Sequence, residues 1–193
     1  MPWSPNHKLA TRERLLTSAA KLFTNFGYDN VGIDEITSDA GLTRGVFYRY
    51  FSSKSELYAE SILQAGQFSA NQMKNACSGE DNFQEQIKCY LSSAHRDGEQ
   101  AHCPLAFLIT DIAHRNSEVR QTYTQMFEKF VEKTRSHGGS KMSRERAIQH
   151  SVMMIGGLAL SRALSDEALS DEVLQSCIES MREEAIQDSE FVA

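Results

Sequence analysis

The sequence predicts an all-α protein of about nine helices in 193 residues. Apolar residues recur at spacings of three and four along most of the chain, which is the pattern of amphipathic helices. Proline occurs three times, at positions 2, 5 and 104, and runs of β-branched residues typical of strands are missing. Because 40% of the residues are hydrophobic and no low-complexity tract occurs, we expect a folded core rather than a disordered chain.

Each expected helix has recognisable start and stop signals. The first carries an apolar face over residues 15–26 and ends at Gly27, and the second stops before Gly41. Ser52 or Ser53 caps the fourth, where Glu56 completes a capping-box pattern. Pro104 lies in the first turn of a later helix, where its missing N–H does no harm, and Ser117 caps the next. The helices after the first are expected at residues 33–39, 43–50, 53–76, 83 to the break at Asp97-Gly98, 103–114, 117–137, 143–164 and 170–187.

Composition and charge indicate a cytoplasmic protein. The longest mostly apolar stretch, 152–164, is shorter than the roughly 20 residues of a membrane span, and the N-terminus lacks the pattern of a signal peptide. Residues 1–54 carry a net charge of +2, and the rest of the chain therefore sums to −8. An acidic body repels polyanions, so a nucleic acid would have to approach the N-terminal block.

Cysteines and histidines predict no metal centre and no cofactor. The four cysteines lie far apart without a CxxC pair, so we expect reduced thiols rather than a zinc ribbon or a disulfide framework. The best candidates for metal ligands have a spacing that fits no common metal site. These candidates are His95, His102, Cys103 and His114.

Residues 33–51 have the spacing of a helix-turn-helix unit. Gly41 supplies a left-handed turn, Leu42 can enter the core between the helices, and Thr43 is placed to cap the second helix. Phe47 and Phe51, four residues apart, share one face and should pack inward.

The opposite face of that second helix carries the residue types that read DNA. Arg44, Tyr48 and Arg49 point away from the core, where arginine can contact guanine or phosphate and tyrosine can contact phosphate. Lys54 follows at the start of the next helix, where it and the helix amides can hold a phosphate. Spacing alone leaves a second interpretation open, a surface pair of short helices with ordinary solvated charges.

Residues 8–58 resemble the N-terminal domain of the tetracycline-repressor (TetR) family of bacterial transcription regulators. The matching segments are residues 11–16, 19–23, 27–28 and 33–36, AGLTRG at 40–45, VFYRYF at 46–51, and residues 53–57. The resemblance implies an all-helical homodimer with a three-helix DNA-binding domain (residues 1–52) and a C-terminal domain (residues 53–193) for effector binding and dimerisation.

The resemblance also implies roles for individual residues. By position, Arg44 and Gly45 match the base-contacting start of the recognition helix, and the phosphate contacts match Thr43, Tyr48, Tyr50 and Lys54. Tyr50 stands where the family usually has histidine, and Gly32 stands where Ser or Thr usually opens the second helix. Because glycine offers no side-chain contact, we expect fewer phosphate contacts from that helix.

Beyond residue 58 the chain matches the family in its plan of helices. We expect an apolar effector pocket lined by Phe68, Phe83, Tyr90, Cys103, Phe107, Leu108, Tyr123 and Phe127. We expect the last two helices to form a dimer bundle through Met153, Gly157, Leu160, Leu174 and Ile178, with an intramolecular core as the alternative. Cys103, at a helix start before Pro104, is either a buried structural cysteine or a thiol sensor.

The function these expectations describe is a ligand-responsive transcription regulator and not an enzyme. We expect a repressor that binds a palindromic operator as a homodimer and is released by a small neutral or amphipathic effector, or by one that reacts with a thiol. Two alternatives remain at this point: a cysteine-dependent enzyme that pairs Cys103 with His102 or His114, and a helical adaptor that has lost DNA binding.

Overall fold

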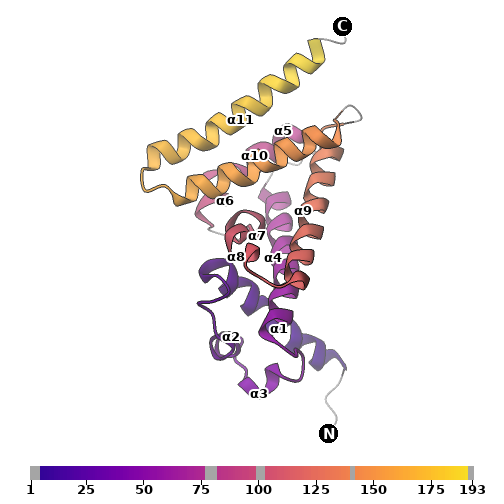
Figure 1. Ribbon diagram of the computed structural model, residues 1–193, viewed down its shortest axis with the longest axis vertical. Helices are drawn as coiled ribbons and strands as arrows, with labels where there is room; N and C mark the ends of the chain where they lie inside the picture. Colours follow the sequence, from indigo (N-terminus) through magenta and orange to yellow (C-terminus); the bar gives the residue numbers. More distant parts are fainter. Residues whose placement is uncertain (1–4, 77–81, 99–102, 140–141, 191–193) are drawn as a thin grey trace. The chain divides into compact units, whose positions relative to one another are not determined.

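The computed structural model describes residues 5–76, 82–98, 103–139 and 142–190, which form eleven helices and no strand (Figure 1). The all-α prediction is therefore confirmed. The helices are α1 (Pro5–Phe26), α2 (Ile33–Asp39), α3 (Arg44–Phe47), α4 (Lys54–Ala76), α5 (Phe83–Tyr90), α6 (Ser93–Asp97), α7 (Pro104–Phe107), α8 (Ile109–Ala113), α9 (Ser117–His137), α10 (Arg144–Ala163) and α11 (Glu167–Glu190).

Two expected helices are each divided in two, which accounts for eleven helices rather than nine. Ser92 has extended backbone, and its hydroxyl accepts a hydrogen bond from the N–H of His95, so a new helix begins between α5 and α6. Leu108 (φ −107°, ψ 3°) leaves helical geometry and separates α7 from α8.

Two other helix starts differ from the prediction because a neighbouring side chain supplies the cap. The side-chain Oδ1 of Asn116, rather than Ser117, accepts from the N–H of Val119 at the start of α9. Asp166 accepts from the N–H of Leu169, so α11 begins three residues before the expected Ser170. The stop of α1 at Gly27 (φ +77°) and the bounds of α2 agree with the prediction.

The chain folds into two compact units that do not follow the order of the sequence. One unit comprises Met1–Phe68 with His102–Met126, and the other comprises Ser69–Ala101 with Phe127–Ala193. Helices α4 and α9 therefore contribute residues to both units. The expected boundary between residues 52 and 53 separates a DNA-binding domain from an effector-binding and dimerisation domain. This functional division stays a prediction.

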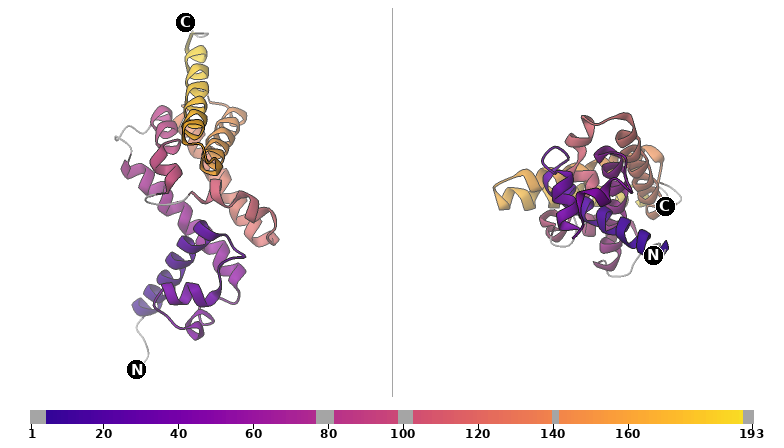
Figure 2. Two further views of the ribbon diagram at one scale, coloured as in Figure 1. Left: turned by 90° about the vertical axis from the view of Figure 1, so that its left-hand side faces the viewer. Right: turned by 90° about the horizontal axis from the view of Figure 1, so that it is seen from below.

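The first unit has an aromatic cluster between α1, the turn after it and α4. The Tyr58 ring lies 4.7 Å from Phe23 and 5.0 Å from Tyr28, measured between centroids, and Phe23 and Tyr58 are 1% and 0% exposed. The Tyr58 hydroxyl donates to the Asp111 carboxylate of α8. Helix α2 packs against α1, and α3 packs against α2 (Figures 1 and 2). Helix α2 is therefore attached to this core through α1, and α3 is attached through α2.

The second unit is built on α10 and α11, which pack along each other (Figures 1 and 2). Polar side chains inside this unit are hydrogen-bonded to one another. The Gln86 amide donates to the Thr134 hydroxyl at 3.2 Å, and the Ser151 hydroxyl donates to the same oxygen at 3.4 Å. Cys89 is disulfide-bonded, so the expectation of reduced thiols is wrong at this position. Cys103 and Cys177 are not in disulfides, and Cys77 lies outside the described residues.

His95 in the second unit should make folding stability depend on pH. Its ring is buried, Nδ1 lies 2.7 Å from the Tyr90 carbonyl oxygen, and burial lowers the pKa of His95 below 6.5. Below about pH 6.5 the unfolded chain binds a proton that the folded chain does not, so the free energy of unfolding falls as pH falls, by at most about 1.4 kcal/mol per pH unit. Urea unfolding between pH 5 and pH 7 measures this fall. The fall should be smaller in His95→Gln, which leaves the other histidines unchanged, and an equal fall in both proteins would contradict the assignment.

Candidate nucleic-acid interface

The turn between α2 and α3 is held by backbone geometry and by one arginine from α1. Gly41 has φ +63°, the left-handed conformation that the sequence predicts, and the N–H of Leu42 donates to the Thr37 carbonyl at 2.7 Å. Arg14 donates through Nη2 to the carbonyl oxygens of Ala40 and, at 3.2 Å, of Gly41. A Cβ atom at Gly41 would lie 2.8 Å from this Nη2 atom. Arg14 therefore fixes the turn, a role that spacing within residues 33–51 did not indicate.

Two buried phenylalanines anchor α3. Phe47 is 0% and Phe51 1% exposed, and their rings stack with centroids 5.9 Å apart. The prediction that both point inward is confirmed. Since α3 has four residues, its orientation depends on this packing rather than on its own hydrogen bonds.

The outer side of α3 exposes the residues expected to contact DNA. Thr43 occupies the N-cap position, makes no side-chain cap hydrogen bond and is exposed. A Cβ at Gly45 would meet no described atom within 4 Å, and no close packing in the described chain accounts for glycine here. The exposed members of the set are Thr43, Arg44, Gly45, Tyr48 and Arg49, and Tyr50 is half-buried.

Arg44 is already engaged by an acid of α2. Its Nη1 lies 2.7 Å from Oδ2 of Asp34, and both side chains are largely exposed. Contact with Tyr48 and the charge of Asp34 raise the pKa of Arg44, so its guanidinium remains charged. Sequence spacing does not indicate this pair, because the two residues lie on different helices.

Lys54 lies apart from this exposed row. Its ammonium donates to the Tyr28 carbonyl oxygen at 2.5 Å and lies 4.1 Å from the centroid of the Tyr28 ring. Burial lowers the pKa of Lys54. A phosphate contact by Lys54 would require this ammonium to turn outward, so its expected role stays a prediction.

A second cation faces Tyr28 from the junction of α8 and α9. The Arg115 guanidinium lies 4.6 Å from the Tyr28 ring centroid and donates to both carboxylate oxygens of Asp29, at 3.0 and 2.8 Å. Asn116 also donates to the Ser55 hydroxyl at 2.9 Å. The α8–α9 junction is thus joined to the turn after α1 and to the start of α4, a link between residues about 60 to 86 positions apart.

The residues expected to line an effector pocket are divided between the two units. Five of the expected residues lie in the first unit: Phe68, Cys103, Phe107, Leu108 and Tyr123. The side chain of Phe68 is 52% exposed. The Tyr123 hydroxyl donates to the Leu105 carbonyl at 2.6 Å, and burial raises the pKa of Tyr123. The other expected residues lie in the second unit: Phe83, Tyr90 and Phe127.

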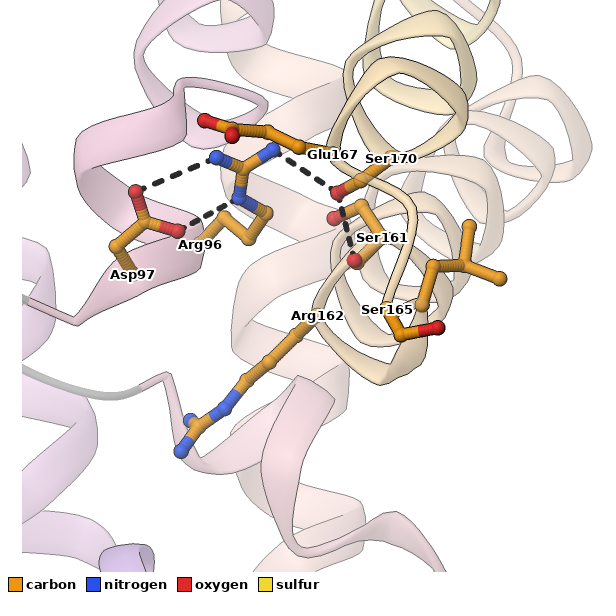
Figure 3. Close-up of a pocket in the computed structure, with 8 residues that line it drawn as sticks. Arg96, Asp97, Ser161, Arg162, Ser165, Glu167 and Ser170 are labelled. Carbon is orange, nitrogen blue, oxygen red and sulfur yellow. Dashed lines mark hydrogen bonds and ion pairs between the residues drawn. The ribbon is translucent and has the colours of Figure 1, made fainter.

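A polar pocket of about 410 Å³ lies in the second unit, where α6 meets the turn between α10 and α11 (Figure 3). Arg96 is buried there, donates to Ser170 at 2.9 Å and pairs with Asp97 and Asp171. Arg162 points away from this cluster in Figure 3. The pocket contains none of the expected effector residues; its lining is Arg96, Asp97, Ser161, Arg162, Leu164, Ser165, Glu167 and Ser170.

The expected dimer residues face in different directions. Leu160 is 62% exposed, whereas Leu174 is 5% exposed. A Cβ at Gly157 would lie 2.8 Å from Sγ of Cys177, so Gly157 faces α11 of its own unit. Met153 and Ile178 are half-buried. The exposed apolar face of α10 instead includes Val152, 56% exposed, and the open side of Gly156, in line with Leu160.

Neither a metal cluster nor a membrane span occurs in the parts of the chain that are described. Within them, no group of three or more His, Cys, Asp or Glu side chains is placed to hold a metal ion. His102, named in the rejected ligand set, lies outside these parts. Among the described helices, none is long and apolar enough to cross a bilayer.

Comparison with known proteins identifies the N-terminal segment. Residues 15–61 match the family described as bacterial regulatory proteins, tetR family. The transcriptional activator FasR of Mycolicibacterium smegmatis is 47% identical over 53 residues, which are 28% of this chain and 24% of FasR. The regulator LmrA of Bacillus subtilis is 23% identical over 164 residues, which cover 78% of this chain and 86% of LmrA.

Solved structures extend the likeness in fold beyond that segment. The reduced form of Escherichia coli NemR matches with a TM-score of 0.72 and 17% identity, over 88% of this chain and 94% of NemR. A TetR-family regulator from Cytophaga hutchinsonii matches with a TM-score of 0.74 and 17% identity, over 93% and 96% of the two chains. FasR, LmrA and the Cytophaga hutchinsonii protein are named as transcription regulators and not as enzymes, so the cysteine-dependent enzyme has no support. Residues 15–61 thus match the TetR family of bacterial regulatory proteins, and the chain shares the fold of a solved regulator of that family.

Proposed function

We propose that the protein is a cytoplasmic transcription regulator whose homodimer binds an inverted repeat in duplex DNA. The observation that carries the proposal is the exposed row on α3, held in place by buried Phe47 and Phe51 and by the Gly41 turn. Arg44 and Arg49 offer the planar donors that recognise guanine or phosphate, and open Gly45 lets the backbone approach a groove. The hydroxyls of Thr43, Tyr48 and Tyr50 are proposed to contact phosphates.

The homodimer is proposed to form through the exposed face of α10. Val152, Gly156 and Leu160 follow one another at a spacing of four, so they form one apolar stripe. A glycine in the middle of this stripe allows a second α10 helix to approach closely. Two-fold symmetry then requires two half-sites separated by about one helical turn of DNA or somewhat more.

An effector is proposed to act through the α8–α9 junction. Arg115 pairs with Asp29, and Asn116 bonds to Ser55, so a shift of this junction would move the turn before α2 and the start of α4. A ligand that prefers the shifted arrangement would release the DNA. Modification of Cys103 is the second option, but its side chain is 5% exposed, so a reagent would first have to open the unit. A reversible ligand is therefore the proposed effector.

Repression is the proposed outcome of DNA binding. A dimer that covers a promoter needs no further surface to block transcription, whereas activation requires an additional contact with the transcription machinery. A reporter gene placed behind the bound site distinguishes the two, because deleting the regulator raises expression under repression and lowers it under activation.

Replacing Arg44 with alanine should weaken operator binding by about 1–3 kcal/mol and relax base preference at one position in each half-site. The reason is the loss of planar donors at the exposed start of α3. Fluorescence anisotropy with DNA that flanks the protein's own gene measures the affinity. Arg120→Ala, a change of the same type on exposed α9, is the control and should bind as the wild type does.

Unchanged affinity and base preference in Arg44→Ala would show that α3 is not the reading helix. If the wild-type protein binds no duplex DNA at all, the adaptor alternative applies instead.

A further inference from the structure

The ion pair between Asp34 and Arg44 joins the two helices of the helix-turn-helix unit on their exposed side. Oδ2 of Asp34 lies 2.7 Å from Nη1 of Arg44, and the side chains are 68% and 57% exposed. An ion pair with this exposure contributes little to folding stability. The main effect of the pair is therefore on how Arg44 is presented at the surface.

The three acids of α2 have different partners. Glu35 accepts from the N–H of Gly32 at 2.6 Å and so closes the N-terminus of α2. Asp39 pairs with Lys21 of α1 at 2.7 Å. Asp34 alone among these three contacts α3. Glu35 thus serves the N-terminus of α2, and Asp39 serves the contact of α2 with α1.

Asp34 fixes one edge of the Arg44 guanidinium. This planar group carries five N–H donors in a rigid arrangement, and the carboxylate accepts from Nη1. The orientation of the remaining donors is thereby set before DNA arrives, which reduces the entropy lost on binding. A carboxylate beside a DNA-reading arginine also has a cost, since it repels phosphates and base acceptors alike.

We propose that Asp34 determines the sequence specificity of the DNA-binding surface. Its carboxylate holds Arg44 in the plane that suits the paired acceptors of guanine, and its charge disfavours every duplex that does not let Arg44 complete that contact. Specificity of this kind depends on a repulsive element as well as on an attractive one. The inference rests on the proposed DNA binding and adds the residue that separates operator from other DNA.

The test compares Asp34→Asn with a matched control, Asp39→Asn. Both variants remove one negative charge from α2 and break an ion pair of 2.7 Å, but Asp39 faces Lys21 rather than α3. The wild-type protein first selects its preferred sequence from a pool of duplexes with a randomised centre. Affinities of all three proteins are then measured for the selected duplex and for a scrambled duplex of the same composition.

In Asp34→Asn the ratio of selected to scrambled affinity should fall about tenfold, the discrimination expected of one bidentate arginine–guanine contact. The scrambled duplex should bind more tightly, and selection with this variant should relax one base pair in each half-site. Asp39→Asn should keep the wild-type ratio. The thermal midpoint of Asp34→Asn should lie close to that of the wild type, because both partners of its ion pair are largely exposed.

Two results would overturn the inference while the proposed function stands. One is an equal change of both affinities in Asp34→Asn, which is the outcome for simple charge removal or for a loosened helix. The other is the same loss of ratio in Asp39→Asn. If the wild-type protein selects no sequence from the pool, the proposed function fails first and the inference fails with it.

Discussion

Replacing Phe47 with alanine should lower the free energy of unfolding by about 3–5 kcal/mol, the usual cost of removing a fully buried phenylalanine ring. Phe47 is 0% exposed, stacks on Phe51 and meets the edge of the Tyr48 ring at 5.0 Å. Urea unfolding followed by circular dichroism measures the change.

Tyr48→Ala distinguishes the packing of α3 onto the protein from its proposed contact with DNA. Tyr48 is 55% exposed, and its ring contributes one edge contact to Phe47, so its loss should cost about 0.5–1.5 kcal/mol of stability. Operator affinity should nevertheless fall in this variant, because the proposed phosphate contact is lost. If Phe47→Ala unfolds at the same urea concentration as the wild type, the anchoring role of the Phe47 ring is wrong.

The local parts of the interface were predictable because their signals lie within a few residues of one another. Four-residue spacing placed Phe47 and Phe51 on one face, and a glycine at position 41 indicated a left-handed turn; the structure contains both features. Glycine at position 32 was expected to offer no side-chain contact, and the structure shows no side-chain cap there; the Glu35 side chain instead accepts from the Gly32 N–H.

The contacts that hold or restrain these parts were not predictable, since their partners are distant in the sequence. Arg14 reaches carbonyl groups 26 and 27 residues away, and Arg115 reaches Asp29 across 86 residues. Lys54 was expected at a phosphate, but the structure places its ammonium on the Tyr28 carbonyl, where burial lowers its pKa. Side-chain spacing on one helix carries no information about such partners.

Apolar periodicity also does not say whether a face is covered by the same chain or by a second copy. Gly157 and Leu174 have the spacing of a bundle interface, yet both are buried within their own unit. A glutamate at position 157 would therefore disrupt packing against Cys177 inside the protomer and would not report on a dimer. The neighbouring stripe through Leu160 provides a cleaner test.

Leu160→Glu should convert the protein to monomers at micromolar concentration and weaken operator binding at least tenfold. Leu160 is 62% exposed in the single chain, so the substitution should leave the protomer folded. In the proposed dimer the new carboxylate would be buried without a partner, which strongly disfavours association. The loss of DNA affinity follows because two linked recognition helices bind far more tightly than two independent ones.

Light scattering combined with size-exclusion chromatography measures the mass, and anisotropy measures the DNA affinity. Leu9→Glu is the matched control for association, since Leu9 is a 68% exposed leucine on α1, outside the proposed α10 stripe. The control should remain dimeric. A folded Leu160→Glu protein that still has the mass of a dimer would remove α10 from the interface, and the two recognition helices would then have to be joined by another surface.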